Sequence, residues 1–156
     1  MTNHNVEFIY VTYIRSTAEK VFDAIINPEI TPQYWGHKNI SDWQVGSTWQ
    51  HIRSNEEQTV ELVGEVIEIN QPKKLVITWA NASQADDQSQ YSRVTFDLET
   101  IDEMVKLTVT HDRLIANSGM HTGISKGWPI VLANLKTLLE TNQAFDLMRI
   151  FTLSKE

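Results

Sequence analysis

Two histidines are among the residues of this chain whose type and position could do chemistry. His111 ends a series of apolar residues at a spacing of two that begins at Val105, so it should share their apolar face at the end of a strand. A neutral imidazole there could hydrogen-bond a ligand or transfer a proton near neutral pH. A histidine in such a place is more often satisfied by a neighbouring backbone group. His51 presents the same two alternatives on its own strand.

Tryptophan supplies the second group of candidates, with five residues in the chain. An indole ring buries a large apolar area and carries one N–H donor, so it can line a pocket and hold a polar ligand atom, or fill core volume. Trp79 and Trp128 are the stronger pocket candidates, because they lie on the faces of the sheet and the helix that should meet. The residues expected to line a ligand cavity are Trp35, Trp49, His51, Trp79, Phe96, His111, Trp128 and Leu132.

Most familiar catalytic and metal-binding patterns are missing from the sequence. There is no cysteine, which excludes thiolate nucleophiles, disulfides and cysteine-ligated metals. No two histidines have the spacing of a helical zinc site, and no phosphate-binding glycine loop, nucleophile elbow or serine triad is present. Glu61 and Glu65 alternate along one strand and should face solvent. We therefore expect no metal, no cofactor and no catalytic residue of these kinds.

Bulk composition indicates one globular domain with an acidic surface. The 156 residues are 41% hydrophobic, enough for a continuous core, and 13 basic against 20 acidic residues give a net charge of -7. An acidic surface repels phosphate backbones, so a nucleic-acid partner is not expected. No apolar run approaches the roughly 20 residues that span a bilayer. With no signal-peptide pattern at the N-terminus, we expect no membrane span and a cytoplasmic location.

A strand and two short helices should open the chain. Residues 6–14 are rich in β-branched and aromatic types, which is typical of a strand. Residues 17–26 place apolar side chains at helical spacing behind a capping Ser16 or Thr17. Residues 28–35 could form a second helix, kept short by Pro32.

Six further strands are predicted, because the apolar period changes to two from about Ile40. The first of them should contain Trp43 and Val45 and end in a tight turn at Gly46. The remaining strands are expected within residues 49–53, 59–69, 74–80, 92–99 and 105–111. Residues 81–90 contain no large apolar side chain and predict a mobile loop.

A long helix should follow, because Trp128, Leu132, Leu135 and Leu139 form one apolar stripe. Pro129 leaves two starting points open: near Lys126 with the proline in the first turn, or near Ser118 with a kink at the proline. Residues 144–153 are irregularly apolar and could be a packed tail or a partner surface. We therefore expect one domain with a core of about 6–142 and an extension, 143–156.

The sheet needs a cover for its apolar face, and the last helix is the only long element available. One helix cannot fill the concavity of a strongly twisted sheet along its whole length. The expected fold is thus α+β, with a curved antiparallel sheet of about seven strands wrapped around the C-terminal helix. The cavity should lie in the space that the helix leaves over.

The order of elements and residues resembles the SRPBCC superfamily, and within it the branch named after the C-terminal domain of the Hsp90 ATPase activator Aha1. The resemblance runs from about Val11 to Thr141 and rests on the order and spacing of its motifs. These motifs are residues 16–22, 28–35, 45–47, 64–69, 72–75, 78–79, 107–111 and 127–140. The resemblance implies a helix-grip, Bet v 1-like fold with a cavity between sheet and helix. It constrains activity little, because members include lipid carriers, hormone receptors, cyclases and chaperone activators.

Two departures from the family pattern affect what the resemblance implies. The family often has two glycines where this chain has Gly46-Ser47, and it usually ends soon after the long helix. The extension favours oligomerisation or an altered cavity mouth, so both a monomer and a homodimer remain open.

Three functions are compatible with these patterns. The first is binding of a small apolar or aromatic molecule, lipid-like or polyketide-like. The second is a polyketide cyclase or hydratase-like enzyme that uses His111 or His51 for proton transfer. The third, suggested by the family name alone, is a chaperone (Hsp90-type) ATPase-activating or protein-interaction module.

Overall fold

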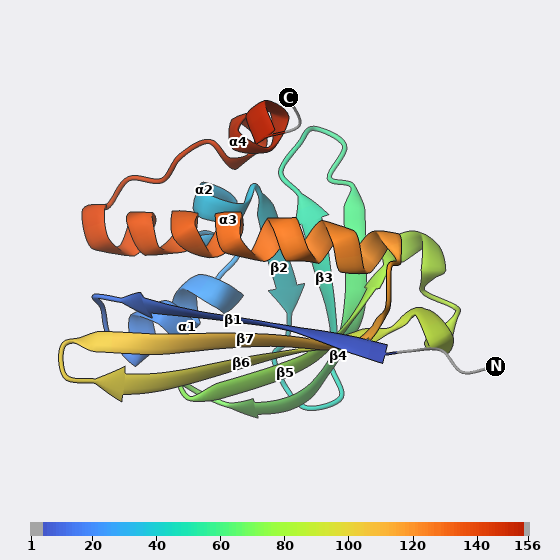
Figure 1. The fold of residues 1–156 in the computed structure, drawn as a ribbon, viewed down its shortest axis with the longest axis horizontal. Helices are drawn as coiled ribbons and strands as arrows, with labels where there is room; N and C mark the ends of the chain where they lie inside the picture. The colour runs from blue at the N-terminus through green and yellow to red at the C-terminus, as the bar shows by residue number, and fades with distance from the viewer. Residues whose placement is uncertain (1–4, 155–156) are drawn as a thin grey trace.

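An antiparallel sheet forms the frame of the molecule, and the structure, a computed structural model, describes residues 5–154. The strands are β1 (Asn5–Ile14), β2 (His37–Ser41), β3 (Thr48–Arg53), β4 (Val60–Asn70), β5 (Lys74–Asn81), β6 (Ser92–Ile101) and β7 (Met104–Ile115). They lie side by side in the order β1-β7-β6-β5-β4-β3-β2, and each neighbouring pair is antiparallel (Figure 1). The two edge strands are therefore β1 and β2.

Among the described residues, two helices lie between β1 and β2, and two follow β7. They are α1 (Ala18–Ile26), α2 (Thr31–Trp35), α3 (Gly119–Thr141) and α4 (Leu147–Ser154), with short 3₁₀ helices η1 (Ala82–Gln84) and η2 (Gln88–Gln90) between β5 and β6. Within residues 5–154, no helix combines the length and the apolar character needed to cross a membrane.

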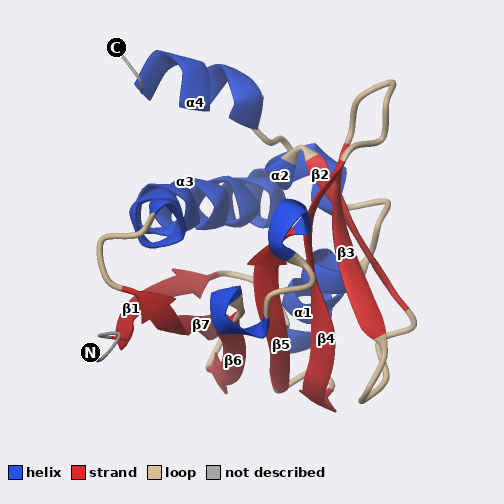
Figure 2. Ribbon diagram, turned by 90° about the vertical axis from the view of Figure 1, so that its right-hand side faces the viewer, coloured by secondary structure: helices blue, strands red, loops and turns tan. Residues whose placement is uncertain are grey.

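The long helix α3 lies along the concave side of the sheet, which curves around it. In Figure 2, β1, β7 and β6 lie below α3, while β4, β3 and β2 rise beside it. Helix α4 lies on the side of α3 that faces away from the sheet. This is the helix-grip arrangement expected from the sequence.

Side-chain caps fix where the two main helices begin. The hydroxyl of Thr17 accepts a hydrogen bond from the backbone N–H of Lys20 (3.2 Å), so Thr17 is the residue that caps α1. The hydroxyl of Ser118 does the same for His121 (3.1 Å) at the start of α3. Of the two predicted starting points the earlier one is therefore found, and Pro129 lies inside the helix.

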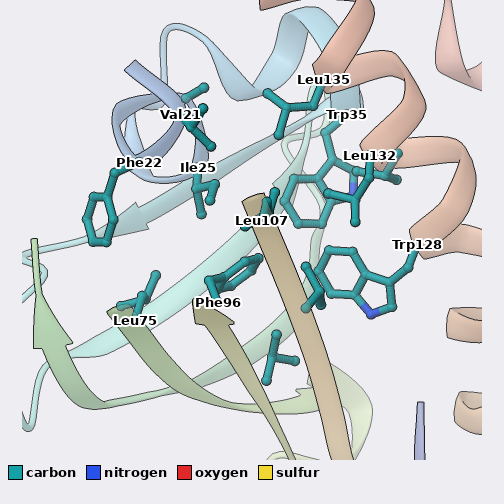
Figure 3. Close-up of a cluster of buried hydrophobic side chains, with 14 of the residues drawn as sticks. Val21, Phe22, Ile25, Trp35, Leu75, Phe96, Leu107, Trp128, Leu132 and Leu135 are labelled. Atoms are coloured by element: carbon teal, nitrogen blue, oxygen red, sulfur yellow. The ribbon is translucent and has the colours of Figure 1, made fainter. Parts of the chain in front are cut away.

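The core fills the space between the sheet and the helices on its concave side. Figure 3 shows Val21, Phe22 and Ile25 of α1 on one side of the cluster, with Phe22 near Leu75 of β5. The labelled residues of α3, which are Trp128, Leu132 and Leu135, lie on the other side. The apolar alternation read from the sequence thus points to the correct face of the strands.

One expectation about local structure was wrong. Trp43 is not in a strand, because its φ of 53° is left-handed and its N–H donates to the side chain of Ser41 (2.9 Å), where β2 has just ended. The segment 81–90 connects β5 and β6, as expected of a loop, and contains η1 and η2. The hydroxyl of Tyr91 donates to the carbonyl of Ala85 (2.8 Å), and Asp87 caps η2.

Gly64 of β4 sits at a close approach that excludes a side chain. It pairs with Trp49 of β3, whose ring reaches over it to donate from Nε1 to the carbonyl of Thr78 on β5 (2.7 Å). A Cβ at position 64 would lie 1.9 Å from that carbonyl oxygen and 2.4 Å from the indole nitrogen. The absence of a side chain at Gly64 is what allows Trp49 to bridge the strands.

Replacing Gly64 by alanine should therefore destabilise the fold by about 3 kcal/mol or more, since a backbone carbonyl and a buried ring must both move. Urea unfolding of the purified variant measures this loss. The control is Gly127→Ala in α3, where a Cβ meets nothing within 4 Å and helix propensity should raise stability by up to about 1 kcal/mol. An unchanged unfolding midpoint for Gly64→Ala would contradict the proposed close approach.

Candidate functional site

Six aromatic and imidazole rings gather between the sheet and α3, and we call them the ring cluster. Trp79 of β5 lies at its centre, with ring centroids 5.3 to 6.4 Å from those of the other five. The members of the ring cluster are Trp35, Trp49, His51, Trp79, His111 and Trp128.

The cluster brings together most of the residues predicted from sequence to line a cavity. Phe96 of β6 packs edge-on against Trp128 with a centroid distance of 5.8 Å, and Leu132 follows one turn later on α3. Aromatic pairs at such distances and tilts are favourable packing arrangements. The rings therefore pack against one another in the concavity where the sequence predicted a cavity.

A chain of hydrogen bonds runs through the cluster and ties α3 to three strands. Nε1 of Trp128 can only donate, and it donates to Nδ1 of His111 on β7 (3.0 Å). The imidazole proton must then be on Nε2, which donates to the hydroxyl of Ser92 on β6 (2.7 Å). That hydroxyl in turn donates to the carbonyl of Trp79 on β5 (3.1 Å). Both nitrogens of His111 are thus used inside the protein.

His111 is consequently held as a neutral structural residue. Burial lowers its pKa to about 3, although the nearby Asp112 acts in the opposite direction. A ring that is neutral at physiological pH and has both nitrogens occupied cannot exchange a proton with a substrate. The geometry therefore supports the structural alternative for His111 rather than the acid–base one.

The indole N–H of Trp79 is buried and has no hydrogen-bond acceptor among the described residues. The N–H groups of Trp49 and Trp128 have the partners described above, whereas Nε1 of Trp79 is buried with no partner among residues 5–154. The side chain is only 4% exposed. An unpaired buried N–H costs on the order of 1–3 kcal/mol, so this donor is an exception that calls for a cause.

A small pocket of about 110 Å³ adjoins Trp79, and we call it the indole pocket. Two glycines of α3, Gly123 and Gly127, leave space because they carry no side chain, and Phe151 of α4 closes one side. The lining consists of Trp35, Trp79, Gly123, Ile124, Gly127, Trp128, Val131 and Phe151. Of the residues predicted to line a cavity, Trp35, Trp79 and Trp128 therefore lie in its wall. Trp49, Phe96, His111 and Leu132 pack outside that wall, and His51 faces a different cleft.

Asn134 of α3 holds the C-terminal extension in place, a role that sequence reasoning missed. Its side-chain oxygen accepts from the N–H of Phe145 (2.7 Å), and its Nδ2 donates to the carbonyl of the same residue (2.9 Å). The same Nδ2 also donates to the carbonyl of Tyr34 on α2 (2.8 Å). Leu147 is buried, so the extension is a packed tail at the mouth of the indole pocket. In the sequence, the one sign of this role is an asparagine between apolar residues of the helix.

A second group of polar side chains, also missed, lies at the edge of the sheet formed by β2. The ring of His37 stacks on that of His51 with centroids 4.2 Å apart and planes 8° apart. Glu61 contacts Nε2 of His37 with one oxygen and the guanidinium of Arg53 with the other (3.1 Å). The side chain of Glu61 is 32% exposed, so it reaches solvent as expected, and it also has these two partners. A register shift between β3 and β4 beside His51 places Glu61 within reach of both partners.

Protonation of His111 should make the fold sensitive to acid. Its pKa is about 3 in the folded chain against 6.5 when unfolded, so the unfolded chain binds the proton more readily. Stability should be fully present above pH 6.5 and be lost as the pH falls toward 3, by roughly 5 kcal/mol over the whole window. Urea midpoints measured from pH 7 to pH 4 should fall accordingly.

The matching variant is His111→Gln, which removes the titrating group. It should be less stable than the parent at pH 7, because the hydrogen-bond chain is broken, but should lose less stability between pH 7 and pH 4. An equal loss in both proteins would mean that another group carries the effect.

Comparison with known proteins identifies relatives of the whole fold. A family model described as activator of Hsp90 ATPase homolog 1-like protein matches residues 15–140. Comparison with curated protein sequences finds no match. Among solved structures, the Aha1 dimer from Colwellia psychrerythraea superposes with a TM-score of 0.73 at 20% identity, covering 87% of this chain and 97% of that one.

Two further structures show the same likeness. A protein from Mesorhizobium loti has a TM-score of 0.72 at 25% identity, over 86% of this chain and 97% of that one. An HSP90 activator from Plasmodium falciparum has a TM-score of 0.70 at 24% identity, over 86% of this chain and 96% of that one. Since the family model spans most of the chain, from the residue after β1 to the last turn of α3, this protein belongs to the activator of Hsp90 ATPase homolog 1-like family.

Proposed function

We propose that this protein binds a small, mainly apolar molecule in the indole pocket, with the N–H of Trp79 as the polar contact. The observation that carries the proposal is the buried, unpartnered Nε1 of Trp79 beside a pocket lined by rings and glycines. Ligand sites commonly combine an apolar lining with a few placed polar groups. A ligand oxygen that accepts from Nε1 would remove the cost of leaving this donor unpaired.

The size and polarity of the indole pocket narrow the class of ligand. A volume of about 110 Å³ suits a single aromatic ring, since an apolar cavity of roughly 150 Å³ in a protein core can hold benzene. The ligand should carry an acceptor such as a carbonyl or ether oxygen, because the free group is a donor. A larger lipid-like or polyketide-like molecule would require α4, which contributes Phe151, to move aside. The lack of cysteine suits action in the cytoplasm.

Binding without catalysis is the form of this function that the site favours. His111, the first candidate for proton transfer, has both ring nitrogens engaged within the protein. No titratable side chain belongs to the lining of the indole pocket. A cyclase or hydratase reaction would need an acid or a base in contact with the ligand.

A second candidate is action on an Hsp90-type chaperone, which the family description and the Plasmodium falciparum relative suggest. The outer face of β1 supports it, because Ile9, Val11 and Tyr13 form an exposed row on an edge strand. The purified protein should then raise the ATPase rate of an Hsp90 chaperone, and Val11→Glu should lower that effect without unfolding the domain. An unchanged ATPase rate would remove this candidate.

The binding proposal predicts a specific response in a two-dimensional indole NMR titration. Acetophenone, which has one ring and one carbonyl, should shift the indole N–H signal of Trp79 and saturate, because its oxygen accepts from Nε1. Ethylbenzene, which has no acceptor, should bind more weakly and shift this signal less. The signal of Trp49, whose N–H already has an acceptor, serves as the internal reference.

Two variants, with one control, test separately whether binding needs the space in the pocket and the N–H donor of Trp79. Gly127→Leu should fill the pocket and abolish saturation, whereas Lys126→Leu adds the same side chain at an exposed neighbouring position and should leave binding intact. Trp79→Phe keeps a ring but removes the N–H, so acetophenone should bind about three- to tenfold more weakly. If neither compound saturates, or if Gly127→Leu binds like the parent, the indole pocket is not a ligand site.

A further inference from the structure

A second depression lies on the other side of the ring cluster, between β3, β4 and η1, and we call it the His51 cleft. It measures about 450 Å³ and is open to solvent. It shares no lining residue with the indole pocket. Its lining consists of His37, His51, Val60, Glu61, Leu62, Asn81, Ala82 and Ser83.

The hydrogen bonds around His51 determine which ring nitrogen is free. Nδ2 of Asn39 donates to the carbonyl of Ile25 (2.9 Å), which leaves the Asn39 side-chain oxygen as an acceptor. Nδ1 of His51 lies 2.6 Å from that oxygen and therefore carries the proton. In the neutral ring Nε2 is then an acceptor, and no described residue donates to it.

Burial, and after it the stacked His37, keeps His51 in this neutral form. Burial and then the adjacent His37 lower the pKa of His51 well below its usual range. His37 itself is fixed between the carbonyl of Trp35, which accepts from Nδ1 (3.0 Å), and Glu61 at Nε2. His51 is only 3% exposed, and it belongs to the lining of the cleft.

The other side chains that line the cleft disfavour the binding of an ion. Glu61 would repel an anion, yet both of its oxygens already contact cationic or N–H-donating partners, Arg53 and His37, so it offers little to a cation. Val60 and Leu62 supply apolar wall beside these groups. A neutral molecule with one hydrogen-bond donor and a small hydrocarbon part matches this combination.

We infer that the His51 cleft is a binding site for a small neutral alcohol or phenol, whose hydroxyl donates to Nε2 of His51 while its hydrocarbon part contacts Val60 and Leu62. This site goes beyond the proposed function, because it takes a hydrogen-bond donor whereas the indole pocket takes an acceptor. The two sites differ in lining residues and in the polarity they select. Occupancy of one can therefore be measured separately from occupancy of the other.

The test is an NMR titration that follows the imidazole nitrogens, with phenol and anisole as the two probes. Phenol should move the ¹⁵N signal of Nε2 of His51 in a saturable way, because accepting a hydrogen bond changes the lone pair of that nitrogen. Anisole has the same ring but no donor, and should leave the signal in place. The Nε2 signal of His111, which already has a partner, is the internal reference.

A matched pair of variants tests the location without altering His51. Ser83→Phe on η1 should obstruct the cleft and weaken phenol binding about tenfold or more, whereas Ser89→Phe on η2 places the same ring outside the lining and should not. Gly127→Leu, which fills the indole pocket, should leave phenol binding at the His51 cleft unchanged. An equal response to phenol and anisole, a silent Nε2, or phenol binding lost in Gly127→Leu but kept in Ser83→Phe would each overturn the inference.

Discussion

The need to satisfy polar nitrogens in an apolar interior governs how this domain is built. The indole and imidazole rings between sheet and helix bring N–H groups and lone pairs into an apolar interior, where they need partners. The chain from Trp128 through His111 and Ser92 to the carbonyl of Trp79 meets this need across α3, β7, β6 and β5. The same bonds therefore fix the position of the helix over the sheet, and the fold and the candidate sites depend on one set of contacts.

Two ring nitrogens of the cluster, Nε1 of Trp79 and Nε2 of His51, take no part in this chain of hydrogen bonds. One of them is a donor and the other is an acceptor. Trp79 presents a donor toward the side covered by α4, and His51 presents an acceptor toward the side bounded by β4 and η1. The rings of these two residues are 6.1 Å apart, yet the two cavities share no lining residue. One cluster of rings thus borders two cavities of different polarity.

The fold could be predicted from the sequence because the residue patterns that indicate its strands and helices are periodic. Alternation along β6 and β7 and the stripe from Trp128 to Leu139 each repeat several times, so a single misread residue changes little. The site was less accessible, because it depends on side-chain contacts between distant positions. Nothing local marks Asn134 as the residue that holds Phe145, or Glu61 as the partner of His37. The boundaries of a cavity are inaccessible for a related reason, since they depend on how the large rings pack.

The closeness of the rings also has an optical consequence. Trp35, Trp79 and Trp128 have centroid separations of 5.5 to 6.4 Å, a range in which excitation of one indole passes to its neighbours before emission. The three indoles therefore act as one chromophore, with coupled transitions in near-ultraviolet circular dichroism and shared fluorescence. A bound molecule that quenches any one of them would lower the fluorescence of all three. Binding in the interior could therefore be followed by intrinsic tryptophan fluorescence, without an added label.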